Sequence, residues 1–291
     1  MLSVLQQYPL GYAIGLFVVG ACVGSFLNVV ILRLPRLMQH QWNKQCRQLL
    51  ELAQDDSDSA RQQPPGLVVP PSHCPGCKAL IRPWHNIPLL SYLLLRGRCA
   101  NCKQSISLRY PLVELITALL TLLAGFHFAP GFALLAALLF TWSLVALSFI
   151  DLDHQILPDN ITLPLLWLGL LANTLGLFTT LEEAVLGAIG GYLSLWLVYQ
   201  IHHRLTGREG MGYGDFKLLA VIGAWLGWKI LPVVVLMASL AGSVIALSLI
   251  LVGRHRREIP ISFGPYLAIA SWMAMMWGDS ILHNYLRIFA L

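Results

Sequence analysis

An otherwise apolar segment of the chain opens with Met211-Gly212-Tyr213-Gly214-Asp215-Phe216-Lys217, which places a carboxylate directly behind two glycines. A charge near bilayer depth is costly, so an ionisable residue in such a position is a candidate functional residue. A second carboxylate, Asp151, ends the apolar run Phe132–Ile150. The chain of 291 residues is 57% hydrophobic and only 11% charged, whereas a soluble domain carries roughly 25% charged residues. This composition predicts a polytopic membrane protein.

Apolar runs suited to membrane helices recur along the rest of the chain. The breaks between them contain glycine, proline or charged residues. We therefore expect an all-α polytopic protein of about eight transmembrane helices in a lipid bilayer. The expected spans are about Tyr12–Leu32, Pro111–Phe128, Phe132–Ile150, Asn160–Phe178, Glu183–His202, Asp215–Trp228, Leu231–Val252 and Ile261–Ile281.

Basic residues set the predicted orientation. Eleven of the nineteen Lys and Arg residues lie between Arg33 and Arg109, and such an excess is typical of a cytoplasmic loop. The N-terminus is then outside, residues 1–33 form the first transmembrane helix, residues 34–110 form a cytoplasmic loop, and residues 111–291 form a seven-helix domain. This order of crossings places Asp151 and Asp215 together at the inner face. Because the basic residues are confined to a few loops, they do not indicate a nucleic-acid partner.

Four of the six cysteines form two Cys-x-x-Cys pairs, Cys74 with Cys77 and Cys99 with Cys102. Four thiolates suit a tetrahedral zinc ion and leave no open position, which favours a structural site over a catalytic one. The predicted cytoplasmic location keeps thiols reduced. We therefore expect one zinc ion per chain in a small loop domain, with a pair of disulfides or free thiols as the alternative.

Two carboxyl groups within a few Å of each other share a proton, because both cannot easily ionise. The charged member can deprotonate water while the neutral member polarises a peptide carbonyl, which is aspartic-protease chemistry. The alternative is that each Asp caps a helix or pairs with a nearby base, and Lys217 is two residues from Asp215. Asp159, directly after Pro158, is expected to be a helix N-cap.

Three further positions have a structural and a functional interpretation. Asn28 in the first span is expected either to make a hydrogen bond between helices or to serve a site. Glu114, one turn inside the second span, is expected to pair with Arg109 or to line a site. Gly187 and Gly191 form a Gly-x-x-x-Gly pair, which favours close helix packing.

Four ordered motifs together resemble those of the bacterial type IV prepilin peptidases. Gly212-Tyr213-Gly214-Asp215 looks like the GxGD motif of intramembrane aspartyl proteases. Asp151, followed after six residues by Pro158-Asp159, is similar to the other half of that signature. Gly24-Ser25-Phe26-Leu27-Asn28-Val29-Val30, with Arg33-Leu34-Pro35 after it, resembles the N-terminal motif of the family. The paired Cys-x-x-Cys loop is similar to the form common in Gram-negative bacteria, so the resemblance covers nearly the whole chain.

The resemblance implies a bifunctional enzyme of the bacterial inner membrane with its active site facing the cytoplasm. Such enzymes cut the basic leader from prepilins and from secretion-system pseudopilins after a Gly, and then N-methylate the new N-terminal residue with S-adenosylmethionine. By motif, the protease aspartates are Asp151 and Asp215. The residues that bind the methyl donor are left unassigned, since no Gly-rich Rossmann pattern occurs in the sequence.

Two other classes of function compete with the enzyme. A transporter could use Asp151 and Asp215 to carry protons or cations, although such sites usually lie near mid-bilayer between repeated halves. A membrane-anchored zinc-binding module would leave the two aspartates without a role. Replacing either Asp by Asn distinguishes these hypotheses, because only the enzyme loses leader cleavage.

Overall fold

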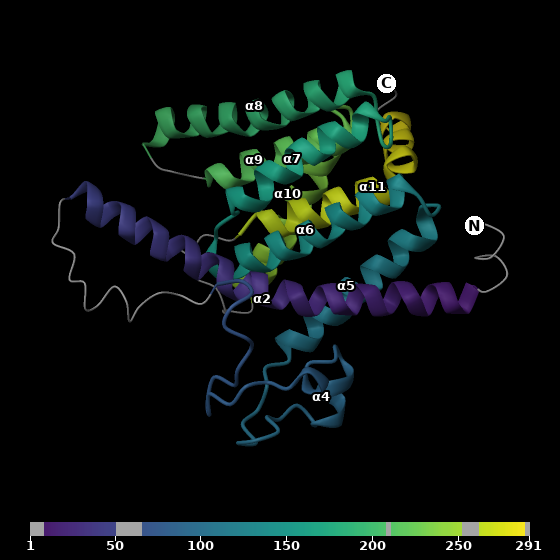
Figure 1. Cartoon of the computed structure of the whole chain (residues 1–291). Helices are drawn as coiled ribbons and strands as arrows, with labels where there is room; N and C mark the ends of the chain where they lie inside the picture. The colour runs from purple at the N-terminus through teal and green to yellow at the C-terminus, as the bar shows by residue number, and fades with distance from the viewer. Residues whose placement is uncertain (1–8, 51–65, 208–210, 252–261, 289–291) are drawn as a thin grey trace. The chain divides into compact units, whose positions relative to one another are not determined.

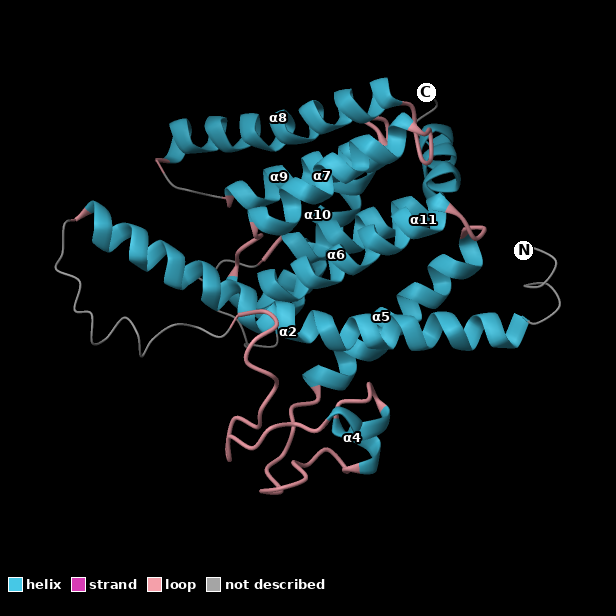
Figure 2. Cartoon of the chain, in the orientation of Figure 1, coloured by secondary structure: helices cyan, strands magenta, loops and turns pink. Residues whose placement is uncertain are grey.

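The computed structural model describes residues 9–50, 66–207, 211–251 and 262–288 of the chain (Figure 1). Regular structure in these ranges is helical, apart from two isolated β-bridges (Figure 2). The all-α prediction is therefore confirmed. The helices are α2 (Pro9–Leu49), η1 (Pro83–His85), α4 (Leu90–Leu94), α5 (Arg109–His127), α6 (Phe132–His154), α7 (Asp159–Thr174), α8 (Leu181–Thr206), α9 (Tyr213–Leu226), α10 (Leu231–Leu251) and α11 (Gly264–Ile288).

Five of these helices, α2, α5, α6, α8 and α10, are long and apolar enough to cross a bilayer within the described residues. This confirms a multi-pass membrane protein. The expected spans coincide with α2 and with α5 to α11, usually to within a few residues at each end. Helices α7 and α9 have 16 and 14 residues, which is less than the roughly 20 residues of a full crossing. The end of the expected span Leu231–Val252 and the start of the last expected span, Ile261, lie outside the described residues.

The chain divides into two compact units, Met1–Leu123 and Ala124–Leu291. In the first unit, α2 continues well beyond Leu32, where the apolar run was expected to end. Its 41 residues extend over about 60 Å, roughly twice the thickness of a bilayer's hydrocarbon core. The residues after Pro35 are mostly Gln, Leu, Met, Lys and Arg, which are good helix formers, so the helix continues although its apolar character ends.

Close packing joins α2 to α5 in the first unit. A Cβ atom on Gly20 would lie 2.7 Å from the Cα of Ala118, and one on Gly24 would lie 2.7 Å from the Cα of Glu114. Neither position leaves space for a side chain. The motif glycine Gly24 therefore brings α2 against the turn of α5 that carries Glu114.

Helix α9 is the core of the second unit, with ten buried residues among its fourteen. It packs on α7, α8 and α11. The close approach of α8 depends on Gly187 and Gly191, since a Cβ on Gly191 would lie 2.5 Å from the carbonyl oxygen of Leu219 on α9. The packing role predicted for this Gly-x-x-x-Gly pair is confirmed.

The end of α9 away from Asp215 is fixed by the buried side chain of Asn173 on α7. Its Nδ2 donates to the carbonyl oxygens of Ala224 and Trp225 at 2.9 and 3.0 Å. Its Oδ1 accepts from the backbone N–H groups of Phe178 and Thr179, both at 3.1 Å. A buried amide whose hydrogen bonds are all satisfied in this way fixes the position of α7 relative to the end of α9.

Candidate active site and metal centre

Asp151 lies in the last turn of α6 and is only 5% exposed. Its Oδ2 accepts a hydrogen bond from the backbone N–H of Gly264, at the start of α11, at 3.1 Å. Its carbonyl oxygen accepts from the Ser262 hydroxyl at 2.9 Å. A Cβ on Gly264 would lie 2.7 Å from Asp151 Oδ2, so only glycine allows this approach. A carboxylate at the C-terminal end of a helix faces an unfavourable dipole, which argues against helix capping as its role.

Asp215 lies in the first turn of α9 and is 9% exposed. The N-cap position is Gly212, with extended backbone. The charge of Asp151 acts on Asp215, so the two carboxylates lie within electrostatic range of each other. The structure therefore brings together the two acids singled out in the sequence, from helices α6 and α9.

Leu157 links the surroundings of the two aspartates. This residue is buried and lies two positions after Gln155, whose backbone is left-handed with φ of 54°. A Cβ on Gly214 would lie 2.9 Å from the Cβ of Leu157, and one on Gly264 would lie 3.3 Å from its Cδ2. One side chain thus contacts the glycine that precedes Asp215 and the glycine that donates to Asp151.

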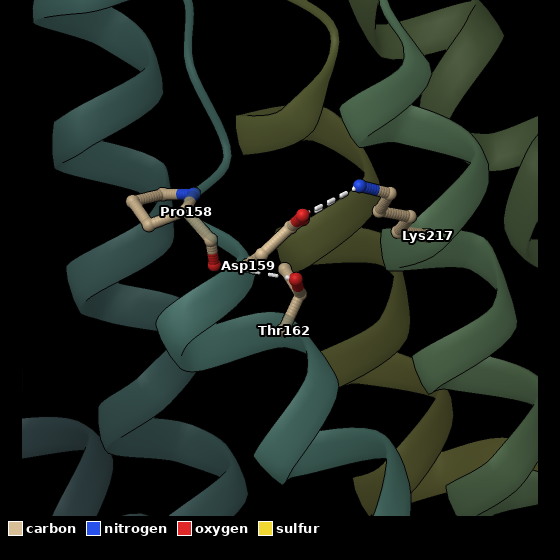
Figure 3. Close-up of polar contacts among 4 residues, drawn as sticks. All are labelled: Pro158, Asp159, Thr162 and Lys217. Carbon is tan, nitrogen blue, oxygen red and sulfur yellow. Dashed lines mark hydrogen bonds and ion pairs between the residues drawn. The ribbon is translucent and has the colours of Figure 1, made fainter. Parts of the chain in front are cut away.

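The ammonium group of Lys217 contacts Asp159 (Figure 3), with Nζ 2.7 and 2.8 Å from the two carboxylate oxygens. Neutralisation of Asp215 by this base, the alternative considered for the sequence, is thus not the arrangement observed. The predicted N-cap role of Asp159 is also wrong by one position, because Pro158 is the N-cap and Asp159 begins α7. The Thr162 hydroxyl donates to the Pro158 carbonyl at 3.2 Å, which leaves the Asp159 carboxylate available to Lys217.

The two Cys-x-x-Cys pairs form matching turns. Cys74 N–H donates to the carbonyl of Ala79 and Cys99 N–H donates to that of Gln104, at 2.9 and 2.8 Å. A lysine follows each second cysteine, and both Lys78 and Lys103 have left-handed backbone. Antiparallel bridges, His73 with Leu80 and Arg98 with Ser105, close the turns.

The four sulfur atoms of Cys74, Cys77, Cys99 and Cys102 all lie within 4.8 Å of one another. The Cys74 and Cys102 sulfurs are 3.8 Å apart, close to the separation of about 3.8 Å for ligands about 2.3 Å from a tetrahedral zinc ion. All are free thiols, so the disulfide alternative does not hold. The cluster predicted from the cysteine spacing is present, and its donor set and size fit zinc.

Hydrogen bonding in the cluster favours thiolates at two positions. Backbone N–H of Ala79 and the Asn101 amide lower the pKa of Cys77 to about 6, and backbone N–H groups of Cys102 and Asn101 lower that of Cys99. A backbone hydrogen bond at Gln104 lowers the pKa of Cys102, but desolvation and the neighbouring sulfurs outweigh it and raise the value to about 11. Four thiolates in this volume need a cation to offset their mutual repulsion.

The other sequence-predicted positions of the first unit have specific contacts. Asn28 Nδ2 donates to the Tyr110 carbonyl at 3.0 Å, which is the predicted hydrogen bond between helices. Glu114 Oε2 accepts from the Leu89 backbone N–H at 2.8 Å, and its carboxylate also bonds to the Ser25 side chain. These contacts join the motif around Gly24 to the segment between the two cysteine pairs.

Sequence reasoning missed the contributions of Leu157, Ser262 and Gly264 to the aspartate site. Leu157 stands in the Asp-to-Pro-Asp motif but occupies one of its unspecified positions. Ser262 and Gly264 directly follow residues 252–261, which lie outside the described residues, and they belong to no recognisable spacing pattern. No signal in the sequence connects Gly264 with Asp151, which lies 113 residues earlier in the chain.

Two family models match the chain. The bacterial peptidase A24 N-terminal domain matches residues 18–128, and the type IV leader peptidase family matches residues 138–247. The cysteine cluster and Glu114 fall in the first match, and Asp151 and Asp215 fall in the second. No solved structure matches the chain.

Curated relatives are similar along almost their whole length, and each of three examples is named a prepilin leader peptidase/N-methyltransferase. The protein of Stutzerimonas stutzeri is 51% identical over 97% of this chain and 96% of its own. That of Pseudomonas aeruginosa is 50% identical over 99% and 98%, and that of Aeromonas hydrophila is 52% identical over 99% of each. With identity of this extent added to the family match and the paired aspartates, the chain belongs to the type IV leader peptidase family.

Proposed function

We propose that this protein is an intramembrane aspartyl endopeptidase that removes the leader of type IV prepilins and pseudopilins after Gly and then N-methylates the new N-terminal residue. The single observation that carries the cleavage activity is the convergence of two buried carboxylates, Asp151 and Asp215, within the region matched to the peptidase family. The names of the relatives support both activities. Nothing in the comparisons favours the transporter hypothesis.

Cleavage follows from two carboxyl groups that share one proton. The charged group takes a proton from water while the water oxygen attacks the peptide carbonyl carbon, and the neutral group donates its proton to the carbonyl oxygen. The tetrahedral intermediate collapses when the carboxyl group that took the proton from water passes it to the peptide nitrogen and the C–N bond breaks. Asp151 and Asp215 act as one titrating unit in this scheme. The Gly264 N–H holds one carboxylate in place, and Gly214 leaves the backbone close to Leu157.

The proposed location is the bacterial inner membrane, with the aspartates near the cytoplasmic face. The excess of basic residues between Arg33 and Arg109 supports this orientation. A substrate with a basic leader and an apolar helix would place the junction of the two at this depth, where the aspartates can reach the scissile bond.

The four cysteines would hold zinc, a cation that both turns would coordinate with two thiolates each. The cysteines thereby fix the ends of the segment that contains η1 and α4. This role is structural, because four thiolates leave no position for a substrate. S-adenosylmethionine is the proposed methyl donor.

The test uses purified full-length protein and a synthetic prepilin with a basic leader, a Gly-Phe junction and an apolar helix. Mass spectrometry follows leader loss and methyl addition with and without S-adenosylmethionine. Wild type should lose the leader and gain one methyl group, and Asp151→Asn and Asp215→Asn should not cleave. Asp153→Asn is the matched control, because Asp153 is exposed on the same helix. Cleavage that persists in both active-site variants would refute the assignment of the aspartates.

A further inference from the structure

Glu114 is the single acidic side chain within the described residues of the first unit, 9–50 and 66–123. The same residues include ten Lys and Arg residues. They are the eleven that lie between Arg33 and Arg109 except Arg61, which is outside the described residues. The remaining acids of the unit, Glu51, Asp55, Asp56 and Asp58, lie outside the described residues. Glu114 is also half-buried in a helix long and apolar enough to span a membrane. A lone carboxylate in such surroundings is costly and calls for a functional explanation.

The carboxylate of Glu114 is held by donors from two other elements. The Leu89 N–H donates to Oε2 at 2.8 Å, and Ser25 on α2 makes a side-chain hydrogen bond. Leu89 has φ of 60° and ψ of −48°, and the next residue, Leu90, donates its N–H to the Pro88 carbonyl at 2.5 Å. A leucine in this conformation is strained. The cysteine turns and the adjoining loop therefore hold a backbone donor against Glu114 in a geometry that the local sequence does not favour.

Both reactants of the proposed methylation are cationic. The methyl donor is a sulfonium, and the amino group released by cleavage has a reference pKa of about 7.7 to 8.0, so it is mostly an ammonium at neutral pH. A cationic first unit repels both ions, and one carboxylate within it attracts them. An ionised carboxylate offers about four acceptor positions, and Leu89 and Ser25 use two of them.

We propose that Glu114 binds the new N-terminal ammonium of the cleaved substrate and accepts its proton for methyl transfer. This inference rests on the proposed function. Once Glu114 has taken the proton, the free electron pair of the amine forms a bond to the methyl carbon of S-adenosylmethionine. The carbon–sulfur bond breaks, its electron pair stays on sulfur as a neutral thioether, and the product is a methylated ammonium. Ser25 and Leu89 are positioning residues, because they act through the carboxylate.

The experiment measures methylation of a pre-cleaved pilin peptide with a free N-terminal Phe by the purified full-length protein, from pH 6 to pH 9. Glu114→Gln should lower the methylation rate at pH 7 by about a hundredfold or more. The deficit should shrink as the pH rises, because solvent then deprotonates the amine. The other charged or titratable groups on the contacting elements include Arg109 and Tyr110 on α5, His85 in η1, and Arg33, whose guanidinium donates to the Gly66 and Pro70 carbonyls.

Two further variants separate catalysis from anchoring of the loop. Cys22→Ser, which changes an exposed thiol one turn before Ser25 on α2, is the control and should retain methylation. Ser25→Ala removes one positioning contact, and its methylation rate should fall by about tenfold at most. Undiminished methylation by Glu114→Gln would overturn the inference, as would a loss that is equal at every pH or that comes with loss of bound zinc. If wild type itself fails to methylate, the proposed function fails, and this inference fails with it.

Discussion

The aspartate site of the second unit and the cysteine and Glu114 region of the first unit are built in different ways. The cysteines reach one point through two short turns, each closed by backbone contacts between residues no more than nine apart. The aspartates lie 64 positions apart in sequence and come within electrostatic range because α11 packs on both α6 and α9. Local geometry builds the two cysteine turns, whereas helix packing builds the aspartate site. The two activities should therefore respond differently to substitution.

The largest expected effect is a clean separation of the two activities. Asp151→Asn or Asp215→Asn should lower the cleavage rate by about 10³ to 10⁴-fold or more, because each removes half of the acid–base pair. Methylation of a pre-cleaved peptide should stay within about twofold of wild type. Both rates can be read by mass spectrometry on one protein preparation. Loss of methylation along with cleavage would show that the two regions do not work independently.

The second expected effect is a loss of methylation that largely spares cleavage. Replacing Cys74 and Cys77 together by Ser should reduce bound zinc far below one ion per chain and lower methylation by about a hundredfold, since the Leu89 segment is no longer held. Cleavage should fall much less. Metal analysis of the purified variant provides the measurement. Cys22→Ser is the matched control, because Cys22 is an exposed thiol in α2 outside the cluster.

A smaller effect is expected at the Lys217 and Asp159 pair, which joins the starts of α9 and α7. Because this pair is partly exposed, its loss should change the free energy of unfolding by no more than about 1 kcal/mol. Cleavage should nevertheless fall by about tenfold in Lys217→Met, since the position of Asp215 depends on this end of α9.

The two single variants of the pair should differ in their pH dependence. Asp159→Asn leaves the Lys217 cation without its carboxylate partner two residues from Asp215, and a cation favours an ionised carboxylate. The pH profile of cleavage should therefore move to lower pH in Asp159→Asn and should not do so in Lys217→Met. Identical profiles for the two variants would refute the positioning role of the pair. The exchanged pair, Lys217→Asp with Asp159→Lys, should recover part of the cleavage rate.

The smallest effect on either rate should come from the far end of α9. Asn173→Ala leaves two carbonyls and two backbone N–H groups without their side-chain partner. Each unsatisfied buried group costs about 1 to 3 kcal/mol, so thermal stability should drop clearly. At low temperature, cleavage and methylation should stay within about threefold of wild type. A selective loss of cleavage at full stability would place Asn173 in the active-site machinery instead.

The amino-acid sequence by itself determined the helical membrane class, the approximate bounds of the helices and the cysteine cluster. Each depends on local information, namely the length of an apolar run, the charge of the adjoining loop or a Cys-x-x-Cys spacing. The two aspartates were also identifiable, because an acid is conspicuous in an apolar segment. Errors arose where polar helix formers continue α2 beyond its apolar run to Leu49 and where Pro158 displaced Asp159 from the N-cap.

Only the tertiary structure decided which groups these residues meet. Lys217 bonds to Asp159 across 58 positions, Gly264 donates to Asp151 across 113, and the N–H of strained Leu89 bonds to Glu114 across 25. Periodicity reports which face of a helix is apolar, but it does not report which neighbour that face will meet. That choice depends on where glycines let backbones approach and on which buried polar groups remain to be satisfied once the helices have packed.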